Sequence, residues 1–287
     1  MILSSRWILI SAAAFLCLAI GDSQASASIN IDTLAKPLCP ASQSLPSLQS
    51  LIPVRIKQVI DGDTVKLFDG RSIRIIGLNT PEMNWGKGRA PQPYAKRAWL
   101  SLRDLIRSSK RIYLSLGIEQ KDRYGRTLAH LYGENSSGVR FNLAAQVIHQ
   151  GLGFYIAIPP NLSQSLCFKQ VEKQARIAGR GLWESYAAQL IGKKVRLETG
   201  FQRLSARVDK ALSGKNGWLL SLDGPIVMRI NRNDLQNFDI NQLRVLTGKR
   251  ITVRGWLIDR GEKTQNHQKG YKRWMLNVSH PLSIEAE

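Results

Sequence analysis

Residues 59–82 read VIDGDTVKLFDGRSIRIIGLNTPE, and they place acidic, basic and amide side chains in a segment otherwise rich in β-branched residues. Asp63, Asn79 and the Thr80 carbonyl offer oxygen atoms, which are the ligands that a hard cation such as Ca²⁺ takes. Arg74 lies among isoleucines, and a guanidinium forms two charge-assisted hydrogen bonds with phosphate oxygens. Phosphodiester cleavage requires such groups, because the phosphate oxygens must be neutralised while a water attacks.

Three predicted strands carry these residues. The runs VRIKQVID, DTVKLFD and SIRIIGLN are separated by Asp-Gly pairs at 61–62 and 69–70, which predict hairpin turns and therefore a meander. Arg74 falls inside the third strand, where its isoleucine neighbours indicate a partly enclosed position that needs an anionic partner. The alternative is an ordinary strand arginine that faces solvent.

Helical and strand patterns alternate after this meander. Apolar spacing predicts helices over 93–109, 142–151 and about 164–179, the last of which ends at a pair of glycines. Further strands are expected at 111–116 and 127–132, with KDRYGR between them.

Four motifs in this region together resemble the staphylococcal nuclease family: DGDT at 61–64, IRIIGLNTPE at 73–82, KDRYGR at 121–126 and ARIAGRGLW at 175–183. Their order and spacing are similar to those of the family over residues 51–187. The resemblance implies a five-stranded OB-fold barrel with three helices, so the fold class is mainly β with α. It also implies a Ca²⁺-dependent nuclease that hydrolyses phosphodiester bonds of DNA and RNA and leaves 3′-phosphate ends.

The resemblance also implies roles for individual residues. Asp63 is expected to be a direct metal ligand together with Asn79 and Thr80, although an ordinary turn aspartate is the alternative for Asp63. Arg74 and Arg126 match the two arginines that bracket the scissile phosphate. Glu82 matches the residue that orients or deprotonates the attacking water, and general acid–base groups contribute about 10²- to 10⁴-fold in rate.

A second group of residues is expected to bind substrate. Tyr124 resembles a residue that contacts phosphate or sugar, with a tyrosine at the edge of the core as the alternative, and Arg123 precedes it. Lys87 and Arg89 lie in the Gly- and Pro-rich stretch WGKGRAPQP, which is either a phosphate clamp or an exposed loop.

Asn79 departs from the family pattern, which has a second carboxylate ligand at this position. An amide oxygen still binds a hard cation, but one negative charge is lost, so other divalent cations stay open. A non-catalytic protein that binds nucleic acid or another polyanion is therefore the competing interpretation. Because the other matched residues are present, we favour retained catalysis.

Composition and charge agree with a nucleic-acid partner. The chain has 43% hydrophobic and 22% charged residues, enough apolar residues for a core, and a formal net charge of +20. The excess is spread along the chain: residues 51–187 carry 21 Lys and Arg against 10 Asp and Glu, and residues 188–287 carry 18 against 9. Both halves should attract polyanions.

The four histidines are scattered singly, which argues against a histidine metal site, and His130 is expected to be structural.

The first residues predict export. Residues 1–27 contain an apolar run and end in Ala-Ser-Ala, the layout of a cleaved signal peptide, so we expect a periplasmic or extracellular protein with no stable membrane anchor. Residues 28–50 form an N-terminal extension. Cys39 and Cys167 then remain as a pair that either forms a disulfide or stays as two buried thiols.

Residues 188–287 contain a new series of short strands and one small helix, NDLQNF, which predict a second, OB-like β barrel. A basic groove on it would hold single strands, which we expect to be the preferred form of DNA and RNA. Trp218, Trp256 and Trp274 are candidates for base stacking, but their strand-like surroundings favour a place in the barrel core. No protein partner is evident, and we expect a monomer.

Overall fold

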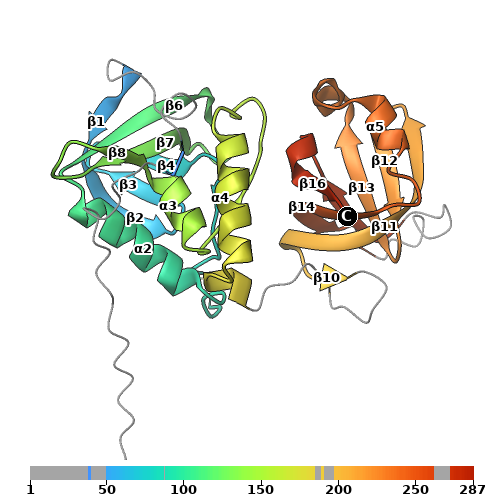
Figure 1. Cartoon of the computed structure of the whole chain (residues 1–287), viewed down its shortest axis with the longest axis horizontal. Helices are drawn as coiled ribbons and strands as arrows, with labels where there is room; N and C mark the ends of the chain where they lie inside the picture. The colour runs from blue at the N-terminus through green and yellow to red at the C-terminus, as the bar shows by residue number, and fades with distance from the viewer. Residues whose placement is uncertain (1–37, 40–49, 87, 185–188, 191–196, 262–271) are drawn as a thin grey trace, which may run out of the picture.

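The computed structural model describes residues 38–39, 50–86, 88–184, 189–190, 197–261 and 272–287. The predicted signal peptide, most of the predicted extension and Lys87 lie outside these residues. Figure 1 shows two β barrels side by side, with helix α4 (Ser165–Ile177) on the side of the first barrel that faces the second.

The first barrel is built from short strands joined by tight turns. Its strands are β1 (Ile52–Val54), β2 (Ile56–Asp61), β3 (Thr64–Leu67), β4 (Ser72–Ile75), β6 (Arg111–Lys121), β7 (Thr127–Glu134) and β8 (Arg140–Asn142). The sheet order is β1-β6-β7-β4-β3-β2, with β8 paired to β7. Only Arg55 separates β1 from β2, so these two strands act as one bent strand that closes a five-stranded barrel.

Both predicted hairpin turns are confirmed. Antiparallel pairing joins β2 to β3 across Asp61-Gly62 and joins β3 to β4 across Asp69-Gly70. Gly62 is required by close approach, because a Cβ atom there would lie 2.7 Å from Ala98 Cβ and 2.9 Å from the Thr80 side chain. The glycine of DGDT therefore lets the first hairpin turn pack against the helix and against Thr80.

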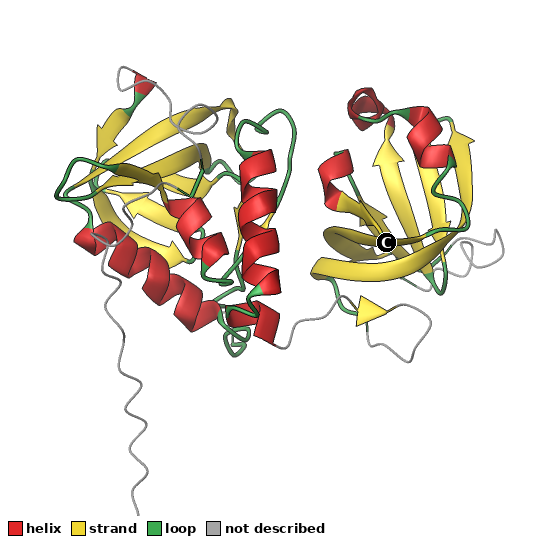
Figure 2. Cartoon of the chain, in the orientation of Figure 1, coloured by secondary structure: helices red, strands yellow, loops and turns green. Residues whose placement is uncertain are grey.

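Helices cover the first barrel, as Figure 2 shows. Helix α2 (Ala95–Ser108) buries Ala98, Leu102 and Leu105, the stripe that the apolar spacing predicts. Helix α3 (Leu143–His149) begins after Asn142, whose side chain accepts a hydrogen bond from Ala145 N, and helix α4 completes the set. Two short strands, β5 (Leu78–Asn79) and β9 (Phe154–Tyr155), form a separate antiparallel pair. The three predicted helices are confirmed, with ends displaced by one or two residues.

The second barrel repeats the strand order of the first. It contains β11 (Gly200–Gly214), β12 (Gly217–Leu222), β13 (Ile226–Asn231), β14 (Arg250–Asp259) and β15 (Trp274–Asn277), with β10 (Gln189–Leu190) and β16 (Ile284–Ala286) at the two ends of the sheet path. Pairing runs β11-β12-β13-β15-β14 and closes through β14 and β11. In each barrel the third strand pairs in parallel with the fifth, β4 with β7 and β13 with β15. This agrees with the predicted OB-like fold of the second half.

Short helices connect the third and fourth strands of the second barrel. The first five residues of NDLQNF fall within a 3₁₀ helix, η4 (Arg232–Asn237), and Phe238 follows its end. Helix α5 (Ile240–Arg244) comes next. Two more 3₁₀ turns are η3 (Gly181–Glu184) and η5 (Pro281–Ser283). Among the described residues, none of the helices is both long and apolar enough to cross a membrane.

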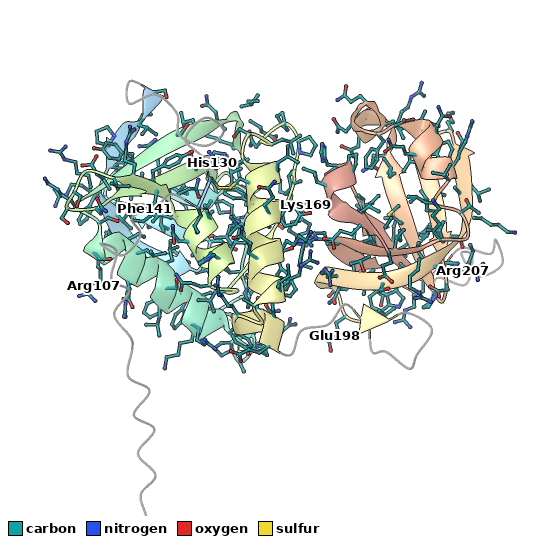
Figure 3. The ribbon with its side chains drawn as sticks, viewed as in Figure 1. Arg107, His130, Phe141, Lys169, Glu198 and Arg207 are labelled. Atoms are coloured by element: carbon teal, nitrogen blue, oxygen red, sulfur yellow. A yellow bond between two sulfur atoms is a disulfide. The ribbon has the colours of Figure 1, made fainter. Side chains whose placement is uncertain are left out.

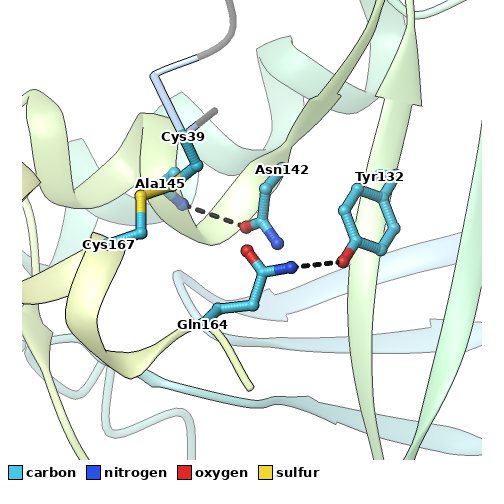
Figure 4. The surroundings of a disulfide bond; sticks show 6 residues. All are labelled: Cys39, Tyr132, Asn142, Ala145, Gln164 and Cys167. Carbon is cyan, nitrogen blue, oxygen red and sulfur yellow. Dashed lines mark hydrogen bonds between the residues drawn. A yellow bond between two sulfur atoms is a disulfide. The ribbon is translucent and has the colours of Figure 1, made fainter. Parts of the chain in front are cut away.

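Cys39 and Cys167 form a disulfide, with their Cα atoms 5.7 Å apart. Figure 4 shows the bond beside the start of α4, close to the hydrogen bond from Gln164 Nε2 to the Tyr132 hydroxyl, which is 2.8 Å long. The structure therefore has the disulfide and not the alternative of two buried free thiols. It ties the segment that precedes the first barrel to its last helix.

A buried ion cluster joins the two barrels. The guanidinium of Arg254 on β14 donates to both carboxylate oxygens of Glu172 on α4, at 2.8 Å each, and to Glu285 at 2.8 Å. Arg254 and Glu172 are 2% and 0% exposed. Arg176 and Arg203 also contact Glu285, at 2.9 and 3.3 Å. Because an unpaired buried charge is costly, separating the barrels would leave Glu172 and Arg254 without their partners.

Candidate active site

Asp63 is the centre of a buried polar cluster at the start of β3. Its Oδ2 accepts hydrogen bonds from the Thr80 backbone N–H at 2.9 Å and from the Thr80 hydroxyl at 3.1 Å. Its Oδ1 accepts from the Thr64 hydroxyl at 2.9 Å. Asp63 and Thr80 are 5% and 3% exposed. Asp63 is therefore no ordinary turn aspartate, because those side chains point to solvent.

Arg74 links the remaining members of this cluster. Its Nη2 lies 3.3 Å from Asp63 Oδ2 and donates to Asn79 Oδ1 at 3.1 Å. Its Nη1 donates to the Leu78 carbonyl at 2.6 Å and to the Ile75 carbonyl at 3.1 Å. The sequence predicted a partly enclosed arginine with an anionic partner, and the structure confirms this. Asp63, Arg74, Asn79 and Thr80, which span 18 positions in the sequence, meet at one point.

The candidate ligand atoms in this cluster are of the type that a hard cation binds, but only one of the side chains is negatively charged. Asp63 supplies one carboxylate, Asn79 supplies an amide oxygen, and every candidate ligand atom is oxygen, as Ca²⁺ requires. In the part of the chain that the structure describes, no three His, Cys, Asp or Glu side chains gather in a way that could hold a metal ion. The set is therefore consistent with a cation bound through one carboxylate, neutral oxygens and water.

Glu82 lies at the base of a loop that follows this cluster. The loop closes through two hydrogen bonds to Gln92, from Glu82 N to Gln92 Oε1 at 2.8 Å and from Gln92 N to the Glu82 carbonyl at 3.0 Å. Trp85 Nε1 donates to the Ile60 carbonyl at 2.8 Å and Met83 N donates to Asp61 Oδ1 at 3.2 Å, which holds the loop against β2. Glu82 itself is exposed, and it follows Thr80 of the cluster by two residues.

The loop also carries the predicted phosphate clamp. Arg89 is exposed within it, whereas Lys87 is outside the described residues. Asn84 Nδ2 donates to the Ala90 carbonyl at 2.8 Å, which fixes the path of the chain across the loop. The loop is thus anchored at several points while Arg89 faces solvent.

The turn between β6 and β7 holds the second predicted arginine. Arg126 Nε donates to Asp122 Oδ2 at 2.7 Å, and Asp122 Oδ1 accepts from the backbone N–H groups of Tyr124 and Arg126 at 2.9 Å each. Burial alone would raise the pKa of Asp122, but the hydrogen bonds from Arg126 and Tyr124 hold that pKa below its usual value. Asp122 therefore stays ionised and orients Arg126.

Tyr124 lies at the outer surface of the same turn. It is 68% exposed, which excludes the alternative of a tyrosine at the edge of the core. Arg123 Nη2 donates to its hydroxyl at 2.7 Å, and the Arg123 and Arg126 guanidinium carbons lie 4.8 and 5.5 Å from its ring centroid. An exposed aromatic ring between two cations is suited to contact with sugars and phosphates.

Strand register relates this turn to the Asp63 cluster. Thr64 pairs with Arg74 across β3 and β4, and Arg74 pairs with Leu128 across β4 and β7. Arg126 stands two positions before Leu128, directly before the start of β7, the strand that pairs with β4. The register thus places the Arg126 turn beside the strand that carries Arg74, although the Arg126 side chain itself contacts Asp122.

Sequence reasoning missed two residues that organise the site. Asp122 had no predicted role within KDRYGR, and the available signal was an aspartate at the start of a glycine-containing turn, where its side chain accepts from backbone N–H groups. Gln92 had no signal, because its two hydrogen bonds to Glu82 depend on the closed shape of the loop.

Comparison with known proteins agrees with this geometry. Residues 72–185 match the family described as staphylococcal nuclease homologue. This match includes Arg74, Asn79, Thr80, Glu82 and Arg126, while Asp63 precedes it.

Individual relatives match a similar region. The chain is 34% identical over 134 residues to the thermonuclease of Staphylococcus intermedius, covering 45% of this chain and 74% of that protein. It is 32% identical over 136 residues to the thermonuclease of Staphylococcus hyicus, covering 46% of this chain and 75% of that protein. An endonuclease of Bacillus subtilis, YncB, is 26% identical over 140 residues, covering 47% of this chain and 63% of that protein. Given these matches and the OB-fold barrel that carries the site, the chain belongs to the staphylococcal nuclease family.

Proposed function

We propose that the chain is a Ca²⁺-dependent nuclease that hydrolyses phosphodiester bonds of DNA and RNA at the Asp63 cluster and leaves 3′-phosphate ends. Family membership supports the nuclease class, and the convergence of Asp63 and Asn79 on Arg74 Nη2 supports the place of the site. That convergence gathers oxygen donors for a cation and a guanidinium for phosphate at one buried point. The cation, the substrates and the product ends are those that the resemblance implies.

The metal ligands in this proposal are Asp63, Asn79 and the Thr80 carbonyl. When bound, Ca²⁺ would supply positive charge to the phosphate oxygens. Thr80 holds the Asp63 carboxylate in place through two hydrogen bonds, so the ligand is oriented before the cation arrives.

Three further residues act on the phosphate and on water. Glu82 orients the attacking water and accepts its proton as the new bond to phosphorus forms. The bond to the 5′ oxygen breaks, and that oxygen leaves as a hydroxyl after it takes a proton from solvent. Arg74 and Arg126 neutralise the non-bridging oxygens, and each is held by a carboxylate, Asp63 or Asp122. Lysine could not replace either arginine, since it lacks the planar pair of donors.

The substrate contacts in this proposal come from exposed groups around the cluster. Tyr124 and Arg123 project from the β6–β7 turn, Arg89 projects from the loop after Glu82, and Lys87 precedes Arg89 in the same loop. Single strands are the preferred form, because an exposed aromatic ring can contact sugars or bases only where they are not enclosed in a duplex.

The mature protein in this proposal is an exported monomer. It begins after the signal peptide at 1–27 with an extension at 28–50, which is followed by a nuclease domain at 51–187 and a second domain at 188–287. The Cys39–Cys167 disulfide supports export, because such bonds persist in oxidising compartments outside the cytosol.

The second candidate function is binding of nucleic acid or another polyanion without cleavage. The observation in its favour is that Asn79 replaces a carboxylate and that Arg74 already contacts both Asn79 and Asp63. In such a protein the arginine would neutralise the single carboxylate, and a cation would have little attraction to the site.

One experiment separates the two candidates. Labelled single-stranded DNA is incubated with the purified mature protein in Ca²⁺, Mg²⁺, Mn²⁺ or EDTA, and the product ends are tested for extension before and after phosphatase treatment. We expect cleavage in Ca²⁺, none in EDTA, and ends that extend only after phosphatase. Intact DNA that the protein nevertheless retains in every metal would establish the binder instead.

A further inference from the structure

The outer face of the second barrel carries apolar and cationic side chains that have no role in the proposed catalysis. Along β12, Trp218, Leu220 and Leu222 are buried in the barrel core, so Leu219 and Ser221 point to the outside. Strand register extends this outer face across neighbouring strands in two rows. The first row is Lys210, Ser221, Val227 and Met275, and the second is Leu212, Leu219 and Arg229.

The floor of this face is apolar. Leu212, Leu219, Val227 and Met275 line it, and Leu212 is 55% exposed. The solvent side of an antiparallel sheet normally alternates to polar residues. Four apolar side chains together on the outer face of a barrel therefore indicate a surface that contacts a ligand.

Cations surround the floor. Lys210, Lys215, Arg229, Arg260 and Lys272 line the same groove. None of the described residues that line it is acidic, although Lys272 lies 3.5 Å from Asp209 just outside the groove. The side chains of Lys210, Lys215 and Arg229 form no hydrogen bond or ion pair with another residue that the structure describes. The charges therefore suit an anionic ligand.

The position of the groove supports a ligand role. Its volume is about 630 Å³. Lys215 and Asn216 form the turn between β11 and β12, and Arg260 and Lys272 flank the connection from β14 to β15. In OB-fold barrels the face of the second and third strands, between these two connections, is where oligonucleotides bind.

We propose that this groove binds single-stranded nucleic acid, with phosphates on the cationic rim and sugars or bases on the apolar floor. A duplex would contact only the rim, because a groove of this volume admits just a few unpaired nucleotides. None of the described residues that line the groove is aromatic, so we expect affinity to depend mainly on the phosphates.

The tryptophans that the sequence singled out do not serve this groove. Trp218 and Trp274 are buried in the barrel core, as their strand-like surroundings predicted. Trp256 is 40% exposed, but its ring lies 5.3 Å from Phe201, which in turn lies 5.2 Å from Phe154 of the first barrel. The binding surface therefore comes from outward-facing aliphatic and cationic residues, which the positions of the tryptophans did not predict.

The test measures binding of fluorescein-labelled (dT)20 to the mature protein in EDTA, where a metal-dependent nuclease does not cut. A groove variant carries Lys210→Gln, Lys215→Gln and Arg229→Gln. A control variant loses the same charge from exposed positions of the same barrel outside the groove, through Arg207→Gln, Arg232→Gln and Lys249→Gln. Arg207 is labelled on the second barrel in Figure 3.

We expect the groove variant to lose affinity on the order of 10- to 100-fold at about 0.1 M salt. The slope of log K against log salt should fall by about 2, since each phosphate contact on a single strand contributes about 0.7. The control variant should stay within about 3-fold of the original protein. Thermal melting of both variants should match the original, because all six changes are at the surface.

Two results would overturn this inference. Equal losses in both variants would mean that net charge alone attracts DNA, and equal affinity for (dT)20 and for its duplex with (dA)20 would exclude a single-strand groove. Cleavage in Ca²⁺ of a substrate too short to reach the groove, such as a dinucleotide, is measured in parallel. The groove changes should leave that cleavage unchanged, so failure of this inference is distinguishable from failure of the proposed nuclease activity.

Discussion

At the scale of single residues, the central feature is an arginine with two roles. Arg74 neutralises Asp63 and holds the Asn79 amide through one nitrogen, Nη2. The sequence predicted that this arginine needs an anionic partner, because isoleucines flank it in a strand. It did not reveal that the partners are the predicted metal ligands themselves, since Asp63 and Asn79 lie 11 and 5 positions away and meet only when β3 and β4 pair.

The low charge of this cluster leads to a prediction for Asn79→Asp. A second carboxylate beside Asp63 adds a negative charge to the ligand set, so Ca²⁺ affinity should rise on the order of 10-fold. The measurement is a titration of DNA cleavage against free Ca²⁺. Asn233→Asp, an exposed position on η4, is the matched control and should leave the titration unchanged. Unchanged or weaker Ca²⁺ dependence in Asn79→Asp would contradict the ligand role of Asn79.

At the scale of elements, local patterns located the strands but not how they pair. Asp-Gly turns and alternation correctly predicted β2, β3 and β4, and apolar spacing predicted the three helices of the first barrel. The parallel pairing of β4 with β7 depends on residues more than 50 positions apart and has no local signal. Strand β9 was missed, because two residues are too few to show an alternating pattern. Leu78 and Asn79 were included in the third predicted strand, but they form a separate strand, β5, that pairs with β9.

Strand β7 also contains a buried histidine that gives a pH-dependent prediction. His130 Nε2 lies 3.1 Å from the Ser163 hydroxyl, and Figure 3 labels this residue within the first barrel. Its burial confirms the predicted structural role and lowers its pKa to about 4. The unfolded chain binds a proton near pH 6.5, so the free energy of unfolding should decrease as the pH falls from 6.5 to 4, by about 3 kcal/mol from this group.

Urea unfolding of the original protein and of His130→Gln between pH 7 and pH 4.5 measures this contribution. The variant should be less stable at pH 7, because it changes a buried position, but its stability should depend less on pH. Curves with the same pH dependence would show that His130 is not the group responsible.

At the scale of the whole molecule, two barrels with one strand order dock through a buried ion cluster. The second barrel was predicted from its series of short strands, and its closure through β11 and β14 agrees with that prediction. The interface was not predicted, because Glu172 and Arg254 resemble ordinary charged residues of a helix and a strand until both are seen to be buried. Strand β9 joins this interface to the site, since Tyr155 O accepts from Arg254 while Phe154 pairs with Asn79.

This docking predicts a large effect of Arg254→Ala. The change leaves Glu172 buried without its counterion, so the free energy of unfolding should fall by about 3 to 5 kcal/mol. The double variant Arg254→Met with Glu172→Gln should recover part of this loss, because Glu172 then carries no charge and Glu285 keeps Arg176 and Arg203 as partners. Chemical denaturation provides the measurement, and Arg232→Ala at an exposed position is the control. A loss below about 1 kcal/mol in Arg254→Ala would contradict a docked pair of barrels.

The measurement that tests the proposed catalysis most directly is single-turnover cleavage of labelled single-stranded DNA in Ca²⁺ by Glu82→Gln. Glu184→Gln, an exposed residue of η3, is the matched control. If Glu82 accepts the proton of the attacking water, the rate should fall by about 10²- to 10⁴-fold while DNA affinity in EDTA changes little and the control cleaves normally. Cleavage by Glu82→Gln at the rate of the original protein would show that the Asp63 cluster and its loop are not the catalytic site.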